Sequence, residues 1–225
     1  MIAARHDAGG GRLRMAIPKG SLFEESLTML TQAGVDVSPL RDHGRQLMVD
    51  TDDFSFIIAR PTDIPAYVAY GAADVAIAGK DTLEEEGLDV VELVDLRFGG
   101  CRFVVAEPED AIGTAEEAYR HLGVVRVATK YPNVTERHFA ERGIQVEVVK
   151  LHGNIELAPL IGLADRIVDI TATGRTLSEN RLRIVEDVLE STARFVANPV
   201  SAALYDDRIT DLAGRLADAA GRLGE

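Results

Sequence analysis

Short apolar runs alternate along the chain with stretches whose apolar positions recur every three or four residues. The short runs predict β-strands, and the longer periodic stretches predict amphipathic helices. Strands are expected at residues 13–17, 54–59, 75–78, 90–94, 102–106, 126–129, 145–150, 167–170, 184–189 and 194–197. Helices are expected at residues 21–33, 63–70, 81–86, 114–121, 133–142 and, as one amphipathic helix, from 201 onward.

Helix ends are marked by capping residues and by glycines. Ser21 with Glu24, and Thr114 with Glu117, have the spacing of a capping box and predict helix starts. Glycines follow four of the expected helix ends, at positions 34, 71, 87 and 143. Alternation of strands and helices predicts an α/β fold whose sheets are mainly parallel, with ligands bound at the carboxyl ends of strands beside helix N-termini.

Composition narrows the range of functions. The 225 residues contain 24 Lys and Arg against 37 Asp and Glu, a formal charge of -13. Such a surface repels phosphate backbones, so it argues against a nucleic-acid or anionic-membrane binder, although a local site can still hold a small phosphorylated ligand. Cys101 is the only cysteine, which excludes an intrachain disulfide and a thiolate metal cluster.

Nothing in the sequence predicts export or membrane insertion. Residues 195–205 form the longest stretch without charge, well short of the roughly 20 apolar residues that a membrane span needs. The N-terminus has no apolar signal region, and its glycines at 9–11 indicate a flexible tail over residues 1–12. A soluble, cytoplasmic protein is expected, with neither nucleic acid nor membrane as a partner.

The sharpest candidate for chemistry is the loop 169–176, which follows an apolar strand. Gly174 permits a positive φ, Arg175 adds a positive charge, and successive backbone N–H groups in such a turn can bind an anion. Asp169 at the strand end could accept hydrogen bonds from ribose hydroxyls. The loop is similar to the one by which phosphoribosyltransferases hold a 5-phosphate, although that loop usually has two adjacent acids. An ordinary turn with a threonine cap explains the pattern equally well. The remaining loop residues are Thr171, Ala172, Thr173 and Thr176.

Five further residues are candidates for substrate contacts. Lys19, Arg60 and Lys130 each follow an expected strand, where a cation could meet a phosphate. Arg45 precedes an apolar patch, and Glu156 is an acid within an apolar stretch, where a carboxylate needs a partner or a ligand. Solvated surface charges, and a helix-start position for Glu156, are the plainer interpretations.

Taken in order and spacing, the motifs resemble the short form of the ATP phosphoribosyltransferase family. The resemblance extends from about residue 13 to residue 201. It rests on segments 18–20 (PKG), 63–65 (DIP), 71–74 (GAAD), 79–81 (GKD), 98–102 (FGGCR), 128–132 (ATKYP), 156–160 (ELAPL), 162–169 (GLADRIVD) and 173–177 (TGRTL).

The resemblance implies two α/β lobes like those of type II periplasmic binding proteins, with the active site in the cleft between them. The chain would cross between lobes near 98–102 and near 191–194. Lobe I would then comprise residues 13–100 and 193–225, and lobe II residues 101–192.

The resemblance also implies the reaction. N1 of ATP displaces pyrophosphate from magnesium-bound 5-phosphoribosyl 1-pyrophosphate, giving N1-(5-phosphoribosyl)-ATP in the first step of histidine biosynthesis. Loop 169–176 would bind the 5-phosphate, Glu156 the ribose, and Arg45 would supply charge at the ATP site, so that Arg45, Glu156 and Asp169 are the expected catalytic residues. No protein metal ligand is expected, since substrate oxygens and water would hold most of the Mg²⁺.

In the short-form family the catalytic chain works with a regulatory subunit that resembles histidyl-tRNA synthetase. The resemblance therefore implies a homodimer when the chain is alone and a hetero-octamer with that partner, and it leaves histidine feedback to the partner. Three positions depart from the family pattern: Ser21 stands where arginine is usual, Asn154 where serine is usual, and Ala172 where the loop is often polar or acidic.

Two other functions fit parts of the sequence. A non-enzymatic ligand-binding protein could share the architecture, because fold alone does not decide function. Neither an export signal nor a basic helix-turn-helix segment supports that alternative. A salvage phosphoribosyltransferase for a free base is disfavoured by the single acid, Asp169, at the loop.

Overall fold

The computed structural model describes residues 11–111, 113, 117, 119–121 and 123–222. Backbone contacts divide the chain into unit 1, residues 1–99 with 192–225, and unit 2, residues 100–191. Each boundary lies one residue before the expected one. No helix in the described part of the chain is long and apolar enough to cross a membrane.

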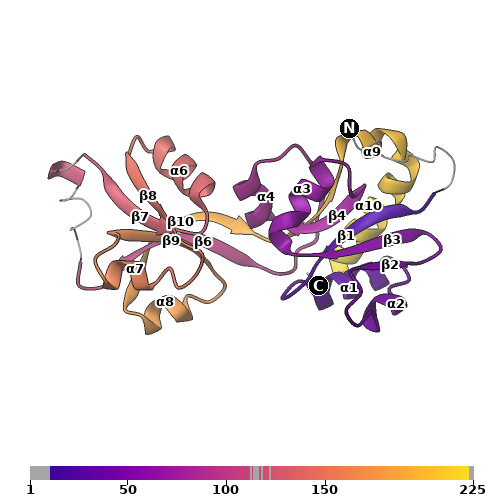
Figure 1. Ribbon diagram of the computed structural model, residues 1–225, viewed down its shortest axis with the longest axis horizontal. Helices are drawn as coiled ribbons and strands as arrows, with labels where there is room; N and C mark the ends of the chain where they lie inside the picture. Colours follow the sequence, from indigo (N-terminus) through magenta and orange to yellow (C-terminus); the bar gives the residue numbers. More distant parts are fainter. Residues whose placement is uncertain (1–10, 112, 114–116, 118, 122, 223–225) are drawn as a thin grey trace. The chain divides into compact units, whose positions relative to one another are not determined.

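Unit 1 is built on a six-stranded sheet in the order β2-β3-β1-β4-β11-β5 (Figure 1). Its strands are β1 (Leu13–Pro18), β2 (Met48–Asp50), β3 (Phe54–Ala59), β4 (Val75–Gly79), β5 (Val91–Asp95) and β11 (Ala193–Ala197). Its helices are α1 (Phe23–Gln32), α2 (Ser38–Arg41), the 3-10 turn η1 (Pro61–Asp63), α3 (Ile64–Ala69), α4 (Lys80–Glu86), α9 (Pro199–Leu204) and α10 (Asp206–Gly221).

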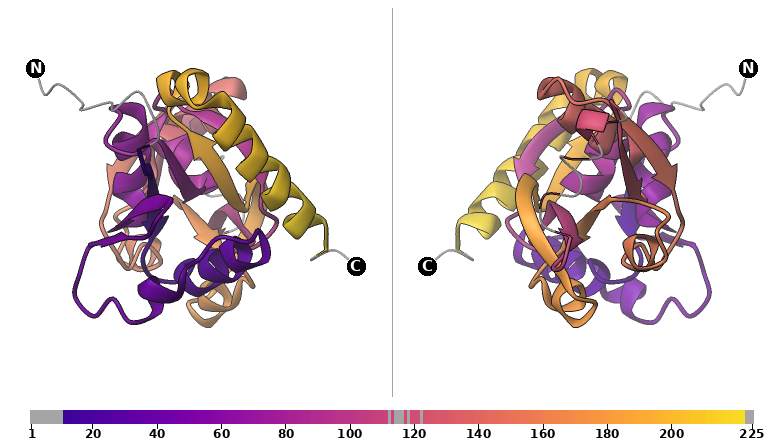
Figure 2. Two further views of the ribbon diagram at one scale, coloured as in Figure 1. Left: turned by 90° about the vertical axis from the view of Figure 1, so that its right-hand side faces the viewer. Right: turned by 90° about the vertical axis from the view of Figure 1, so that its left-hand side faces the viewer.

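Two apolar layers enclose the sheet of unit 1. One face packs Met15, Phe56 and Phe195 against α1 and α10, which lie side by side (Figure 2). The other face is lined by small residues such as Ala76, so that α3 can approach closely and bury Ile64. Aliphatic and small side chains thus form the core of a chain that has few aromatic residues.

Unit 2 repeats this plan around a five-stranded sheet in the order β10-β6-β9-β7-β8. One face packs Phe103 and Val127 against Phe139 of α6, and the other packs Ile167 with Leu177 of α8. The strands are β6 (Cys101–Pro108), β7 (Val125–Thr129), β8 (Val146–Lys150), β9 (Arg166–Thr171) and β10 (Leu182–Ser191); the helices are α6 (Pro132–Glu141), α7 (Leu157–Leu160) and α8 (Arg175–Glu179).

The α/β class is confirmed, but the sheets are mixed rather than mainly parallel. Three neighbouring strands in each unit are parallel: β3, β1 and β4 in unit 1, and β9, β7 and β8 in unit 2. The remaining pairings are antiparallel, because β2 and β3 form a hairpin and because β6, β10 and β11 are formed where the chain leaves a unit and returns. Apolar strand composition did not distinguish these return strands from parallel ones.

Two expected helix features are wrong in detail. Helix α1 starts at Phe23 without a side-chain cap, because a turn with Phe23 N–H bonded to Gly20 O (3.1 Å) places Ser21 before the N-cap position. The C-terminal helix is two helices, with a break at Tyr205, whose φ is −119°. Helix α9 begins at Pro199, before Ser201, because Asn198 caps it. The expected cap at Thr114 and the end of the expected C-terminal helix beyond residue 222 lie outside the described residues.

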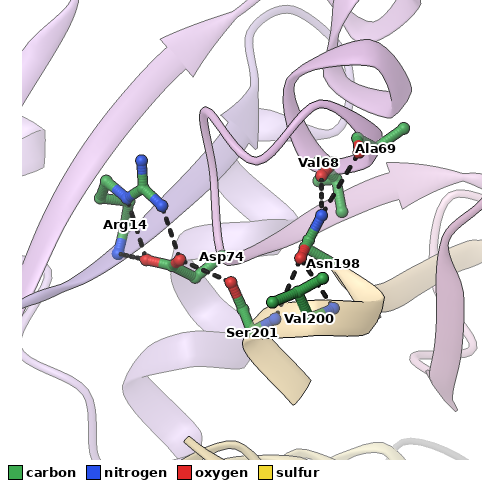
Figure 3. A network of polar contacts seen from close by, with 7 residues as sticks. All are labelled: Arg14, Val68, Ala69, Asp74, Asn198, Val200 and Ser201. Atoms are coloured by element: carbon green, nitrogen blue, oxygen red, sulfur yellow. Dashed lines mark hydrogen bonds and ion pairs between the residues drawn. The ribbon is translucent and has the colours of Figure 1, made fainter. Parts of the chain in front are cut away.

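Helix α9 is fixed to the sheet by a buried polar network (Figure 3). Asp74, just before β4, accepts hydrogen bonds from the backbone N–H of Arg14 (2.9 Å), from its guanidinium (2.7 and 3.0 Å) and from Ser201 Oγ (2.8 Å). Asn198 Oδ1 accepts from Val200 N–H (2.9 Å) and Ser201 N–H (3.0 Å), while its amide donates to Val68 O (2.8 Å). This network leaves the buried carboxylate and the start of α9 fully paired.

An arginine–aspartate clamp, in which an aspartate just before one strand pairs with an arginine of the neighbouring strand, occurs in unit 1 as Asp74 with Arg14 and again in unit 2, where the sequence analysis did not predict it. Asp165, just before β9, accepts from Arg126 N–H (2.9 Å) and from its guanidinium (2.7 and 3.3 Å). In both units the arginine is the second residue of a strand, and the aspartate follows a Gly-x-Ala sequence that ends a short helix. Both clamps lie at the amino ends of the parallel strands, which leaves the carboxyl ends to carry the candidate residues.

Candidate functional site

The carboxyl edge of the unit 2 sheet brings together most of the expected site residues. Thr129 of β7 pairs with Val168 of β9, so the next residues along the two strands, Lys130 and Asp169, reach the same edge. Lys130 is exposed, and burial raises the pKa of Asp169 while the nearby charge of Lys130 opposes that rise. Strand register therefore explains why Lys130 and Asp169 lie near each other although they are 39 positions apart in the sequence.

Asp169 is a buried carboxylate, 8% exposed. Its Oδ1 accepts a hydrogen bond from Ile170 N–H at 2.9 Å. Burial raises the pKa of Asp169 above its ordinary value, and the nearby charge of Glu156 raises it further, while the Ile170 N–H and Lys130 act in the opposite direction. A carboxylate held under these conditions is poised to accept hydrogen bonds from a ligand.

Glu156 stands at the N-cap position of α7 and is partly buried. Its side chain makes no capping hydrogen bond, so the plain role of a helix-start cap does not apply. Asn154, two residues earlier, has a φ of 48°, a conformation that asparagine tolerates better than most residues. Glu156 lies close enough to Asp169 for its negative charge to contribute to the raised pKa of that buried carboxyl.

The loop after β9 turns at Gly174, whose φ of 75° and ψ of 0° are left-handed. Gly174 N–H donates to Thr171 Oγ1 at 2.7 Å, and Arg175 N–H makes a longer contact with Thr173 Oγ1 at 3.4 Å. Two N–H groups of the expected anion nest are therefore taken by threonine hydroxyls. Because these oxygens accept, their own protons remain available to a bound oxyanion.

The other loop residues are open to solvent. Ala172, Thr173 and Thr176 are exposed. Arg175 is exposed as well, and its Nε donates to Glu179 Oε1 at 2.7 Å on the same helix. The positive charge expected at the loop is thus present but shared with an acid one turn along α8.

The carboxyl edge of the unit 1 sheet carries a second group of candidates. Lys19 follows β1 and Arg60 follows β3, and Lys19 N–H donates to Ala59 O at 2.8 Å, so the two strands end together. Arg45 lies in the turn before β2, and the antiparallel register of β2 with β3 carries that turn along the same edge. The structure thus brings three separated cations to one edge of unit 1.

These three cations differ from the basic side chains of unit 1 that form ion pairs. Lys19, Arg45 and Arg60 are exposed, and none of them makes an ion pair within the described residues. Lys80, by contrast, pairs with Glu84 at 2.8 Å and Glu92 at 2.5 Å. In a chain of charge -13, unpaired cations at a strand edge form a local site that can attract phosphates.

One polar centre that the sequence analysis did not single out is Asp95, at the end of β5. It accepts from Arg97 N–H (2.9 Å) and Thr192 Oγ1 (2.7 Å), and it pairs with Arg194 Nη1 (2.6 Å). Thr192 and Arg194 are nearly one hundred positions away in sequence, and only the register of β5 with β11 brings them to Asp95. No local motif could have revealed this centre.

Comparison with known proteins identifies the chain's relatives. The family model described as ATP phosphoribosyltransferase matches residues 60–218. The ATP phosphoribosyltransferase of Rubrobacter xylanophilus is 49% identical over 212 residues, which cover 94% of this chain and 96% of the relative.

Solved structures agree with these relatives. The ATP phosphoribosyl transferase (HisG:HisZ) complex from Thermotoga maritima contains a chain that matches with a TM-score of 0.80 and 34% identity, covering 93% of this chain and 99% of that one. The alkanesulfonate-binding protein SsuA from Xanthomonas axonopodis pv. citri matches with a TM-score of 0.52 at 16% identity, covering 92% of this chain and 72% of that one. The latter likeness shows the fold alone, that of a two-lobe binding protein.

Proposed function

The chain belongs to the ATP phosphoribosyltransferase family, and from this premise we propose which of its residues carry the reaction. The enzyme condenses ATP with 5-phosphoribosyl 1-pyrophosphate, giving N1-(5-phosphoribosyl)-ATP and pyrophosphate, the first step of histidine biosynthesis. The alternative of a non-enzymatic binding protein has only the fold in its favour, because SsuA shares no more than 16% identity.

Unit 2 holds the phosphoribosyl group in this proposal. The observation that carries the assignment is the cluster of Lys130, Glu156 and Asp169 beside the loop that turns at Gly174. Hydroxyl protons of Thr171 and Thr173 donate to the 5-phosphate, and the carboxylates of Glu156 and Asp169 accept from the ribose hydroxyls. The remaining loop contacts come from Ala172 and Thr176 through their backbone, and from the Arg175 side chain.

Unit 1 supplies positive charge for the phosphate groups of ATP or of the departing pyrophosphate. Lys19, Arg45 and Arg60 bind phosphate oxygens, of which Arg45 stabilises either the triphosphate or the departing pyrophosphate. A planar guanidinium can donate two parallel hydrogen bonds to one phosphate, which favours arginine over lysine for that role.

The chemistry demands little covalent help from the protein. The lone pair of adenine N1 forms the new bond to the anomeric carbon, and the bond from that carbon to the pyrophosphate oxygen breaks with its electron pair. The barrier lies in separating charge, so positioning both substrates and stabilising the leaving group supply most of the rate. Asp169 and Glu156 also place negative charge near a ribosyl centre that becomes cationic.

Mg²⁺ enters with the substrate in this proposal. The carboxylates of Asp169 and Glu156 are hard oxygen donors of the kind that Mg²⁺ accepts. Within the described residues no group of three acidic, histidine or cysteine side chains could hold a metal ion. Because Mg²⁺ dehydrates reluctantly and usually binds through substrate phosphates, we assign most of its ligands to substrate oxygens and water, and its chemistry to neutralising the leaving pyrophosphate.

A regulatory partner is the last part of the proposal. The Thermotoga maritima relative is described as a HisG:HisZ complex, and its catalytic chain is covered over 99% of its length. We propose that this chain likewise assembles with a subunit resembling histidyl-tRNA synthetase, as a hetero-octamer, and that it forms a homodimer when alone.

Product formation tests the proposed reaction. The chain is mixed with ATP, 5-phosphoribosyl 1-pyrophosphate and Mg²⁺, and both the ultraviolet spectrum of the N1-substituted adenine and the released pyrophosphate are followed. One pyrophosphate per modified ATP is expected, with none released when free adenine replaces ATP. Turnover of adenine without turnover of ATP would instead indicate a salvage enzyme.

A further inference from the structure

The segment that leads out of unit 1, residues 95–99, is held more firmly than an ordinary linker. Leu96 N–H donates to Ala193 O, and Ala193 N–H donates to Phe98 O, each at 2.9 Å. Phe98 is buried in the core of unit 1, and Asp95 ties the outgoing segment to the returning one through Thr192. The backbone position of Gly99 is therefore set by the sheet and the core.

Gly99 is in close contact with the loop that precedes α1. A Cβ atom built on Gly99 would lie 2.2 Å from Leu22 Cδ2 and 3.7 Å from Leu22 Cγ, so a larger residue at position 99 would displace the terminal methyl group of Leu22. Gly99 also has a φ of 64°, which favours glycine for a second reason. Its neighbour Gly100 has open space at the same point.

Leu22 in turn fixes the end of the loop that carries Lys19. Its side chain packs against the core of unit 1, and its carbonyl accepts from Ser26 N–H (3.0 Å) and Ser26 Oγ (2.6 Å) in the first turn of α1. The Phe23 N–H closes the turn on Gly20 O at 3.1 Å. Between the end of β1 and this turn, the one anchor of Lys19 among the described contacts is the hydrogen bond from its backbone N–H to Ala59 O.

We propose that Gly99 is a positioning residue for the reaction. Because Gly99 has no side chain, Leu22 can pack into the space beside it, and Leu22 then holds the loop 19–22 so that Lys19 meets the phosphates of ATP. The inference rests on the role proposed above for Lys19. It adds a residue of the outgoing segment that touches no substrate and acts through Leu22.

Three variants test this inference, with Gly87→Ala as the matched control. Gly87 has nearly the same φ, 59°, and lies in the same unit with nothing within 4 Å of an added Cβ. Gly99→Ala carries the same backbone strain plus the clash with Leu22, and Gly99→Ala combined with Leu22→Ala removes the clash while keeping the strain. Lys19→Ala tests the proposed function separately.

Two measurements are made on each variant: the KM values for ATP and 5-phosphoribosyl 1-pyrophosphate, and amide hydrogen exchange at Phe23. Gly99→Ala should raise the KM for ATP at least about tenfold, within the ~100-fold that a displacement of 1 Å can cause, and should speed exchange at Phe23. The KM for 5-phosphoribosyl 1-pyrophosphate should stay within about twofold of wild type. The double variant should recover neither effect, because it lacks the Leu22 side chain that holds the loop 19–22.

The inference is overturned if Gly99→Ala matches Gly87→Ala in the KM for ATP and in exchange at Phe23. Equal loss of affinity for both substrates would also overturn it, because that result indicates general damage to unit 1. A normal KM for ATP in Lys19→Ala would contradict the proposed function instead, and exchange at Phe23 would then still decide whether Gly99 positions the loop.

Discussion

Asp169 shows how a single residue can be unfavourable for folding and useful for binding. Its carboxylate is buried beside Glu156, and its compensation within the described chain is one backbone N–H and the charge of Lys130. Burying a charge that is only partly compensated reduces stability. A residue selected for stability alone at this point would be apolar or neutral.

Asp169→Asn should therefore stabilise the fold while reducing activity. The folded state raises the pKa of Asp169, so ionisation destabilises the fold above that pKa and has no such cost below the ordinary value of 3.8. The variant should unfold at higher urea concentration at neutral pH, and its advantage should shrink as the pH falls toward that value. Its kcat/KM should fall sharply, since the amide no longer carries a negative charge.

Urea unfolding across pH, together with steady-state kinetics, checks this prediction. Asp110→Asn is the control, because Asp110 is an exposed acid of the same unit. A destabilised Asp169→Asn protein at neutral pH would show that the carboxylate has a structural role.

Arg45 is the residue whose substitution should most affect turnover without affecting folding. Arg45→Ala should reduce kcat/KM by about 100-fold or more, the effect of removing one electrostatic contact made in the transition state. Arg45→Lys should recover only part of this loss, because an ammonium group cannot reproduce the planar fork. Steady-state kinetics with both substrates measure the effect.

Arg41→Ala serves as the control for Arg45. It removes a nearby exposed arginine that pairs with Glu24 at 3.7 Å, and such surface pairs contribute little. Near-normal kinetics in Arg45→Ala would exclude Arg45 from the site.

At the scale of strands and helices, the arginine–aspartate clamp is the clearest feature that the two units share. In each unit it joins the second residue of one parallel strand to the residue before its neighbour, and so fixes the register at the amino edge. The clamps do not lie at the carboxyl edges, where the candidate residues are found. Structural and functional charges are thus separated at opposite ends of the same strands.

Asp74→Ala should destabilise unit 1 by about 3 kcal/mol or more, the range seen when one partner of a buried pair is removed. Burial disfavours the charged form, but the hydrogen bonds from Arg14 and Ser201 outweigh it and lower the pKa of Asp74. The stability that the carboxylate contributes is therefore present above its ordinary value of 3.8 and is lost as the pH falls through the lower folded value. Urea unfolding should show the gap between wild type and variant closing at acid pH.

Asp165→Ala provides the comparison within the same chain. The Asp165 side chain is 19% exposed against 3% for Asp74, and it lacks a partner equivalent to Ser201 among the described contacts. Its loss should be smaller than that of Asp74→Ala. A larger loss would contradict the view that burial and the third partner set the strength of the clamp.

Sequence periodicity predicted most helices and strands, because each was defined by local features such as apolar runs and terminal glycines. It missed β2, a strand of only three residues in which Met48 is exposed. It also missed α7 and α8, which are too short to show a helical period. Strand direction in β6, β10 and β11 and the partners of Asp95 depend on contacts between distant segments. Lys19, Arg60 and Lys130 were found because they follow expected strands, and Arg45 and Glu156 because they lie beside or within apolar stretches. Their grouping into two edges required the register.

The whole molecule combines strong net acidity with exposed cations at the carboxyl edges of both sheets. The charge of -13 keeps polyanions away, whereas Lys19, Arg45 and Arg60 on unit 1 and Lys130 on unit 2 remain exposed to small phosphorylated ligands. The negative charge of the whole surface repels a long nucleic acid, whereas a single nucleotide is small enough to interact with the local cations alone. Selectivity for nucleotides over nucleic acids follows from this difference.

Histidine regulation is predicted to require the partner subunit. An allosteric effect needs a second site whose ligand distinguishes two states, and we assign that site to the subunit resembling histidyl-tRNA synthetase. The isolated chain should be a homodimer with weak activity that histidine barely changes, and the partner should raise activity and confer inhibition. Histidine calorimetry and inhibition assays on the chain alone test this, and tight binding with strong inhibition would contradict it.

The measurement that tests the central assignment most directly is calorimetric titration of Gly174→Val with each substrate. A β-branched residue at a φ of 75° is strained by about 1–3 kcal/mol and should deform the loop, while the nearest atom to the new Cβ, Ile184 Cδ1 at 3.6 Å, allows ordinary packing. Gly143→Val is the control, with a φ of 68° in the same unit and open space around it. Loop 169–176 as the 5-phosphate site predicts that Gly174→Val weakens binding of 5-phosphoribosyl 1-pyrophosphate far more than binding of ATP, and more than Gly143→Val does. Equal weakening of both substrates, with the fold intact, would contradict it.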